Sequence, residues 1–393
     1  MSLHSPEFAA DPHAAYDDMR RSHGPLVPVE ITVDVPATLV IGYREALNIL
    51  SDPDHFPADP RAWQATVPKH CPVLPMMEWG PTGSKTVGED HSRHRAAYTA
   101  SLEKVDLYAL RRAVEAIAVP LINSFCETGS ADLLGEYAVP LTVRVLNDLL
   151  GLSPEAGQEA FAALVALRDA SDSASTEHSE QRFTAAISDV VAAKRAAPGA
   201  DVITWLIGHS ARFDDAEIVA QTAVLYSTGT EPTWNLIVNA LLLMVTNDQF
   251  HDELLGGALS IRDAIDEVLF TDPPLANFCS RFPRQPQIIG GSWLPVHQPV
   301  VISLAACNND PAVGGDRTGN RSHLAWGAGP RSCPAQSVAM VIVQEALDQL
   351  LDVLPDIELA VPADQLQWRL GAFHRAPTAV PVIFPPAPPL TFV

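Results

Sequence analysis

The chain has 393 residues, of which 47% are hydrophobic and 18% are charged. This composition supplies a large apolar core and is unlike that of a disordered chain. Acidic residues outnumber basic residues 47 to 25, which gives a formal net charge of -22. Because nucleic acids and anionic membrane surfaces attract basic proteins, neither is an expected partner.

The opening MSLHSPEFAADPHAAYDDMRR is mixed and charged, which is not typical of a signal peptide or an anchor. The longest unbroken apolar run, Ala160 to Leu167, is too short to span a bilayer. We therefore expect a cytoplasmic protein.

Cysteine usage disfavours a disulfide framework and a zinc site, because the number is odd and no CxxC pair occurs. Four of the cysteines are expected to be small buried apolar residues, and Cys333 needs a separate explanation. The five are Cys71, Cys126, Cys279, Cys307 and Cys333.

Three regions follow one another along the chain. Between about Asp11 and Asp59, the runs LVPVEITV and ATLVIGY and one short helix, REALNILSD, predict a small sheet. From about Asp90 to Phe270, apolar residues recur mostly at helical spacing, which predicts a large helical body.

The remaining third region begins after the prolines at 273 and 274. It reads as short strands, a glycine-rich loop, one helix from about Pro334 to Val353, and a strand-like tail rich in proline. Since neither a repeat nor a low-complexity linker occurs, we expect one domain over residues 1–393. The expected fold class is mainly α with small β-sheets, α+β.

One segment carries the chemistry, WGAGPRSC, which contains Trp326, Gly327, Gly329, Arg331 and Cys333. A glycine-rich loop followed by a cysteine and an amphipathic helix is expected to place the sulfur at a helix N-terminus. Backbone N–H groups and the helix dipole there favour a thiolate, which suits a metal. The alternative is a buried structural cysteine beside a turn.

This segment resembles the haem-binding loop of cytochromes P450. In that family the glycines let the backbone lie flat against the porphyrin, the aromatic residue shields the sulfur, and the basic residue pairs with a haem propionate. The resemblance implies haem b (iron protoporphyrin IX) as cofactor and Cys333 as the thiolate ligand of its iron. It departs from the family at Ala335, where glycine is usual.

Two further segments match in order and spacing. GEDHSRHRAAYT resembles the helix whose histidine and arginine bind a propionate, which gives His91 and Arg95 on one helix face; a solvated basic face is the alternative. Arg281, ten residues before Gly291, matches an arginine on a strand beside the haem, with Arg284 as a nearby alternative. The resemblance covers nearly the whole chain and implies the P450 fold, with a long central helix over the haem.

The segment TGTEPT resembles the oxygen-activation motif of that central helix. Gly229 is expected to let the helix approach the haem, and Glu231 to act as the acid of the proton relay. Pro232 occupies the position of the usual threonine, and Thr233 is displaced by about 100° around a regular helix. The candidate catalytic residues are therefore Gly229, Glu231 and Thr233, and the alternative is a proline-kinked structural helix.

A second departure is the missing arginine of the family's Glu-x-x-Arg motif, because the chain has Glu267 and then Phe270 at these positions. A buried carboxylate without a partner is costly, so Arg317 or Arg321 is expected to pair with it, unless Phe270 fills the space by apolar packing. The pattern resembles a small actinobacterial subgroup of P450s that lacks this pair.

The resemblance implies a monooxygenase that inserts one oxygen atom from O2 into a small apolar substrate. Electrons would come from a ferredoxin and a ferredoxin reductase, and a thiolate ligand favours O–O cleavage. Two alternatives stay open because of the departures. One is a peroxide-driven or non-oxygenating haem-thiolate enzyme, and the other is a catalytically silent haem protein with a binding or regulatory role. We expect His94 and His178 to be ordinary surface residues rather than metal ligands.

Overall fold

The computed structural model describes residues 1–68, 70–169, 173–247, 250, 253–254, 256–315, 317 and 319–390. The α-helices with described bounds are α1 (Pro6–Ala10), α2 (Pro12–His23), α3 (Tyr43–Ser51), α4 (Arg61–Gln64), α5 (Leu74–Met77), α6 (Gly88–Leu102), α7 (Leu107–Asn123), α8 (Val139–Leu150), α9 (Pro154–Asp169), α10 (Ser173–Ala196), α11 (Val202–Ile207), α12 (Asp215–Thr246), α14 (Ile261–Thr271), α15 (Leu304–Asn308) and α16 (Gln336–Val353). The described residues also form a π-helix, η1 (Leu133–Ala138), and the 3-10 helices η2 (Pro311–Val313), η3 (Gly329–Arg331) and η4 (Ala363–Gln365).

The strands form three small sheets with the orders β1-β2-β7-β4, β3-β9-β8 and β5-β6. Their bounds are β1 (Leu26–Thr32), β2 (Val35–Val40), β3 (Ser130–Asp132), β4 (Asn277–Arg281), β5 (Gln287–Ile289), β6 (Ser292–Leu294), β7 (Val300–Ser303), β8 (Glu358–Leu359) and β9 (Pro381–Ile383).

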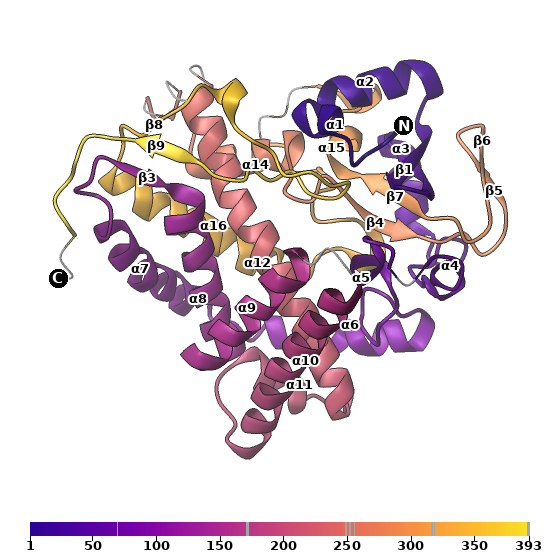
Figure 1. Ribbon diagram of the computed structural model, residues 1–393, viewed down its shortest axis with the longest axis horizontal. Coiled ribbons are helices and arrows are strands. Elements are labelled where there is room, and N and C mark those ends of the chain that lie inside the picture. Colours follow the sequence, from indigo (N-terminus) through magenta and orange to yellow (C-terminus); the bar gives the residue numbers. More distant parts are fainter. Residues whose placement is uncertain are drawn as a thin grey trace.

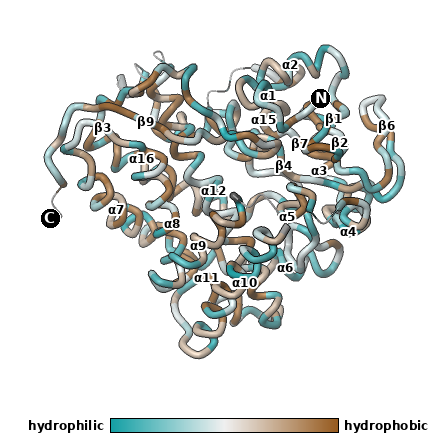
Figure 2. The backbone as a smooth tube through the Cα atoms, viewed as in Figure 1, coloured by the Kyte–Doolittle hydropathy of each residue, from teal (hydrophilic) through white to brown (hydrophobic). Residues whose placement is uncertain are grey.

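Segments that are far apart in the sequence meet in the four-stranded sheet. β1 and β2 pair as an antiparallel hairpin, and β2 then pairs in parallel with β7, with Thr38 opposite Val300. Figure 1 shows this sheet with α1, α2, α3 and α15 around it, while α7, α8 and α16 lie on the other side of the molecule. Figure 2 shows strongly hydrophobic residues in the centre of this sheet, where β2 and β7 lie side by side.

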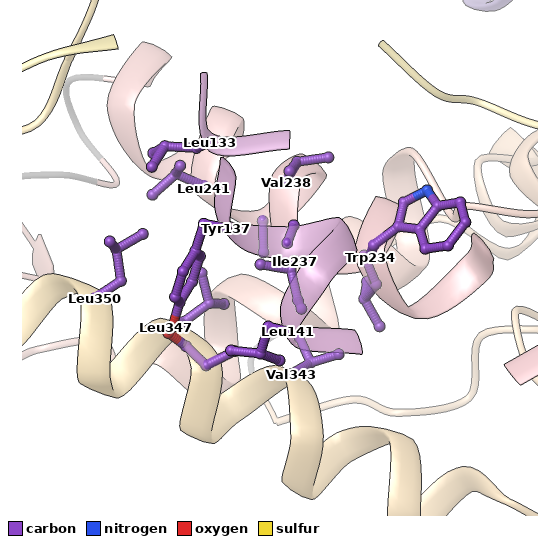
Figure 3. Packing of buried hydrophobic residues seen from close by; sticks show 14 of the residues in the cluster. Leu133, Tyr137, Leu141, Trp234, Ile237, Val238, Leu241, Val343, Leu347 and Leu350 are labelled. Atoms are coloured by element: carbon purple, nitrogen blue, oxygen red, sulfur yellow. Dashed lines mark hydrogen bonds between the residues drawn. The ribbon is translucent and has the colours of Figure 1, made fainter. Parts of the chain in front are cut away.

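The long helix α12 lies between these two parts (Figure 1) and supplies much of the main core. Asp214 caps it in a reciprocal arrangement with Glu217, which satisfies the free N–H groups of its first turn. Figure 3 shows Ile237 and Leu241 of α12 together with Val343 and Leu347 of α16. A rigid helix packed on this core can hold side chains of its middle turns at fixed positions.

Most expected elements are present. The fold is mainly helical with small sheets, the longest apolar run forms α12, and the helix after the cysteine is α16, which begins at Gln336 rather than at Pro334. One prediction was wrong: the start of the chain holds the helix α2 as well as the sheet. Its buried residues Tyr16 and Met19 are three apart, and the charged residues around them hid this short apolar face. In the described part of the chain, no helix has the length and hydropathy needed to cross a membrane.

Candidate haem-binding site

The loop 326–333 has the backbone that its glycines predict. Gly327 and Gly329 both have φ of +69°, a left-handed conformation that side chains rarely adopt. A Cβ atom on Gly329 would also lie 2.6 Å from the carbonyl oxygen of Leu50 in α3. Ala335 has φ of -98°, so this chain needs no glycine at the position where the family usually has one.

Cys333 closes the loop, because its backbone N–H donates to the carbonyl oxygen of Trp326 at 2.7 Å. Trp326 in turn packs against the main core. Burial raises the pKa of the Cys333 thiol, and the backbone N–H of Ala335 and the charge of Arg95 only partly oppose this. Desolvation is the larger effect on the free thiol, and α16 begins three residues after Cys333. Ligation of a metal by the Cys333 thiolate stays a prediction.

Four cationic or potentially cationic side chains gather beside this loop, from three different elements. His91 and Arg95 come from α6, Arg281 from the end of β4, and Arg331 from η3. Arg95 donates through Nη1 to the carbonyl oxygen of Ser332 at 2.5 Å. Arg331 donates to the carbonyl oxygens of Gly83 and Thr86, and Arg281 to that of Ser280.

These groups lower one another's proton affinity. The pKa of His91 falls to about 4 because of burial and then the charges of Arg331, Arg95 and Arg281. The pKa of Arg331 falls to about 10 through burial, Arg281 and Arg95. Arg281 is only 4% exposed, and burial lowers its pKa as well. Clustered cations at this depth are unfavourable without an anion.

An anionic group is the missing partner. Among the described residues no carboxylate forms an ion pair with any of these four, and the buried atoms His91 Nε2 and Arg331 Nε accept or donate no hydrogen bond. Haem carries two propionate carboxylates, so a cluster of charge-assisted donors beside a cysteine fits this cofactor.

Sequence reasoning missed a fifth cation, Lys85, which lies in the segment just before α6. Burial lowers the pKa of Lys85 to about 8, and the charges of Arg281 and Arg331 act in the same direction. Its Nζ donates to the carbonyl oxygens of Met76 and Met77 at 3.1 and 3.2 Å. No sequence motif predicts that Lys85 lies in this cluster, because only the path of its loop in the folded chain brings it there.

The oxygen-activation segment lies within α12, whose hydrogen-bond pattern continues past Pro232. A Cβ atom on Gly229 would lie 3.2 Å from Leu146 Cδ1, so this glycine lets α12 approach α8 closely. Thr233 is buried, at 6% exposure, and Thr228 is exposed. The Thr228 hydroxyl donates to the carbonyl oxygen of Val224 at 2.6 Å, back along the same helix.

Glu231 is tied to the C-terminal loop that precedes β9. Its carboxylate forms an ion pair with Arg369, and its Oε1 lies 4.0 Å from Nε2 of His374. All three side chains are 30% exposed or less. No sequence motif predicts this cluster, because residues 231 and 369 are separated by 138 positions.

The carboxylate of Glu267 has a partner despite the missing arginine. Arg317 donates through Nη1 to Glu267 at 3.2 Å and through Nη2 to Oδ1 of Asn309 at 2.7 Å. Its guanidinium also lies 5.1 Å from the ring centroid of Phe270, at a distance typical of a cation–π contact. Thus one of the two expected arginines pairs with Glu267, and Phe270 packs beneath it.

The other expected arginine, Arg321, binds the neighbouring acid instead. Its Nε donates to Asp266 at 2.9 Å, and Arg262 of the same helix donates to Asp266 at 3.1 Å. The segment before the cysteine loop is therefore held to α14 at two adjacent carboxylates.

Two expectations about histidines and one alternative arginine can be checked directly. His178 is exposed on α10, as expected. The expectation for His94 was wrong, because this side chain is 2% exposed and lies near Thr86 and Glu217. Arg284 is exposed, unlike the buried Arg281.

The fold and the cysteine loop together define the class of haem-thiolate proteins, and comparison with known proteins agrees. The chain is 26% identical over 389 residues to the cytochrome P450 monooxygenase PikC of Streptomyces venezuelae, covering 96% of this chain and 92% of PikC. It is also 26% identical over 404 residues to vitamin D(3) 25-hydroxylase of Pseudonocardia autotrophica, covering 98% and 96%. No protein-family model matches the sequence.

The solved structure of CYP154C4 from Streptomyces sp. ATCC 11861 superimposes with a TM-score of 0.90 over 100% of this chain and 99% of that chain, at 24% identity. The chain belongs to the cytochrome P450 family and is a P450 monooxygenase.

Proposed function

We propose that Cys333 is the thiolate ligand of the iron of haem b and that His91, Arg95, Arg281 and Arg331 surround the two propionates. The observation that carries this proposal is the cationic cluster without a carboxylate partner beside the cysteine. Trp326 shields the sulfur, and the left-handed Gly327 and Gly329 keep the loop thin enough for a flat cofactor. Residues 1–393 then serve as one domain around this group.

When bound, haem with a thiolate ligand supplies the activation and cleavage of O2. The charge of Arg95, beside Cys333, offsets part of the cost of ionising the buried sulfur. On the opposite side, we assign Glu231 as the acid that holds a proton for the oxygen-binding space. Gly229 keeps this turn of α12 close to α8, and Thr233 is a candidate hydroxyl beside the acid.

The finer parts of the function concern the substrate and the electron donor. We propose a small apolar substrate, which is supported by similarity to an enzyme named for vitamin D(3). We propose a ferredoxin and a ferredoxin reductase as electron donors, because bacterial P450s generally take their electrons from redox partners. The protein would work in the cytoplasm.

A second candidate is a peroxide-driven haem-thiolate enzyme. Two observations favour it: Pro232 stands where the relay hydroxyl is usual, and Glu231 is engaged by Arg369. An enzyme supplied with hydrogen peroxide already has its oxygen reduced and protonated, so it depends less on a proton relay than an enzyme that uses O2.

Substrate-dependent consumption of NADPH distinguishes the two functions. The holoprotein is combined with a ferredoxin and ferredoxin reductase and screened against apolar small molecules that shift its Soret band. The monooxygenase proposal predicts oxidised product with NADPH and O2. Product with hydrogen peroxide alone, and none with NADPH and O2 in a reconstitution that reduces the haem, would establish the second function instead.

A further inference from the structure

A histidine from the C-terminal loop lies beside the acid of the central helix. His374 Nε2 is 4.0 Å from Glu231 Oε1, and their side chains are 14% and 15% exposed. Arg369 of the same loop forms an ion pair with that carboxylate. Two groups that exchange protons and one fixed cation therefore meet at the turn of α12 that contains Pro232.

The surroundings of His374 favour its neutral form. Burial lowers the pKa of His374, Glu231 raises it, and Arg369 lowers it again. The next residue in the chain, Arg375, and Tyr16 of α2 both line a small cavity together with His374. A neutral imidazole has one N–H and one free ring nitrogen, so it can accept a proton on one side and release another on the other side.

A small cavity lies next to this histidine. Its volume is about 10 Å³, and its lining includes Tyr16, Asn277, Arg369, His374 and Arg375. This is about the space that the centre of one water molecule requires. The lining includes polar groups of Tyr16, Asn277, His374 and Arg375 within a larger apolar area, and Arg375 Nε has no hydrogen-bond partner. The cavity can therefore hold a water with protein partners.

The cavity also lies close to groups that solvent reaches. Arg375 Nε is 3.6 Å from Asp272 Oδ1, and the same oxygen is 3.0 Å from His13 Nε2. His13 and Asp272 are 40% and 37% exposed. The solvent-exposed pair thus lies beside a lining residue of the cavity, and only water can carry a proton past Arg375, because a guanidinium stays protonated.

We propose that His374 is a proton-transfer residue that supplies Glu231 from this cavity. The inference rests on the proposed function, in which Glu231 is the acid on the oxygen side. A cavity water gives a proton to Nδ1 of His374 and regains one from solvent, while the proton on Nε2 passes to Glu231 Oε1. The imidazole is neutral before and after, and reorientation of the ring returns its N–H to the side of Glu231. One intervening water, or a small rotation of the ring, closes the 4.0 Å gap.

Arg369 has the complementary role of pairing with the carboxylate of Glu231. Its charge also lowers the proton affinity of the neighbouring imidazole. His374 therefore passes a proton on rather than storing it. This arrangement supplies a route that does not need the hydroxyl replaced by Pro232.

The first test measures coupling between the two groups without turnover. Histidine side chains of the reduced, carbon monoxide-bound holoprotein are titrated by NMR, and the His374 signal is assigned by its loss in His374→Gln. Removing the carboxylate charge in Glu231→Gln should lower the His374 pKa by at least about half a unit. His178→Gln, on the exposed face of α10, should leave the signal and its pKa unchanged. A His374 pKa that is the same in wild type and Glu231→Gln overturns the proposal.

The second test measures proton supply during turnover with a substrate found as above. His374→Gln should slow product formation about tenfold, with a larger share of electrons released as hydrogen peroxide. The loss should grow as pH rises, and the variant should keep the Soret shift on substrate binding. Unchanged coupling in His374→Gln contradicts the proposal. If wild type does not turn over with O2 at all, the proposed function fails, whereas the NMR titration still decides whether the pair exists.

Discussion

The two sides of the proposed haem site differ in how closely they follow the P450 family. On the cysteine side, Gly327, Gly329 and Cys333 keep the expected spacing, and the cationic side chains gather around the loop. On the oxygen side, Pro232 replaces the usual hydroxyl, and Glu231 is paired with an arginine 138 positions away. The difference suggests that holding the cofactor tolerates little change, whereas proton supply can be assembled from other elements.

The largest effect is expected on the oxygen side, from Glu231→Gln. A general acid contributes about 10²-fold or more to a rate, so product formation with O2 should fall by about that factor. Substrate binding, followed by the Soret shift, should persist. The measurement is product formed per unit time with a reconstituted electron donor.

Arg369→Gln is the matched control, because it breaks the same ion pair and keeps the carboxylate. Its loss of rate should be clearly smaller than that of Glu231→Gln. Equal losses in the two variants would mean that the ion pair holds the C-terminal loop in place and that the acid has no separate role.

On the cysteine side, Arg281→Ala should weaken haem retention. A hydrogen bond to a charged group contributes about 1.5–3 kcal/mol, which corresponds to roughly tenfold to hundredfold in affinity. The rate of haem transfer to apomyoglobin measures retention. Arg284→Ala, three residues away and exposed, should retain haem like wild type.

Circular dichroism must show that the Arg281 and Arg284 variants are both folded. If both are folded, equal haem transfer rates in Arg281→Ala and Arg284→Ala would show that Arg281 does not bind a propionate. Arg281→Lys keeps a charge without the planar fork and should lie between the two.

The Arg317→Ala substitution, in the segment before the cysteine loop, should lower the stability of the protein. The substitution removes the partner of Glu267, a hydrogen bond to Asn309 and a cation–π contact, and we expect a loss of about 1–2 kcal/mol in the free energy of unfolding. Urea unfolding of the holoprotein measures it. Arg321→Ala should cost less, about 0–1 kcal/mol, since Arg321 is 59% exposed and Arg262 still pairs with Asp266. A larger loss in Arg321→Ala would reverse this ranking.

The smallest effect concerns His13, far from the cysteine. The hydrogen bond that His13 donates to Asp272 raises the pKa of His13 above 6.5, so its contribution to stability is complete below that value and is lost as pH rises through the folded pKa. Because both side chains are more than a third exposed, we expect only about 0.2–0.5 kcal/mol. Urea unfolding of wild type and His13→Gln at about pH 5.5 and about pH 9 should show the difference only at the lower pH. A difference of the same size at both values would contradict the titration.

Sequence reasoning succeeded where the signal was local. The periodicity of α12 and the helix that carries His91 and Arg95 four residues apart both lie within a few turns of chain. Sequence reasoning also limited the expected arginine partners of Glu267 to Arg317 and Arg321. The folded chain shows that Arg317 is the partner.

It failed where tertiary contacts decide. The burial of His94, the position of Lys85 and the engagement of Glu231 by Arg369 and His374 depend on segments that meet only in the folded chain. Likewise, the helix dipole favours a thiolate at Cys333, but burial of the sulfur opposes it more strongly and is not visible in the sequence.

The central claim, that Cys333 ligates the haem iron, is tested most directly by the absorbance spectrum of the reduced protein with carbon monoxide. Wild type should show the red-shifted Soret band of a thiolate-ligated haem, and Cys333→Ser should lack it while still binding haem through the cationic cluster. Cys307→Ser, which changes a buried cysteine whose Sγ donates to the carbonyl oxygen of Val40, should keep the band. A red-shifted band that persists in Cys333→Ser would show that another residue is the ligand and would contradict the account.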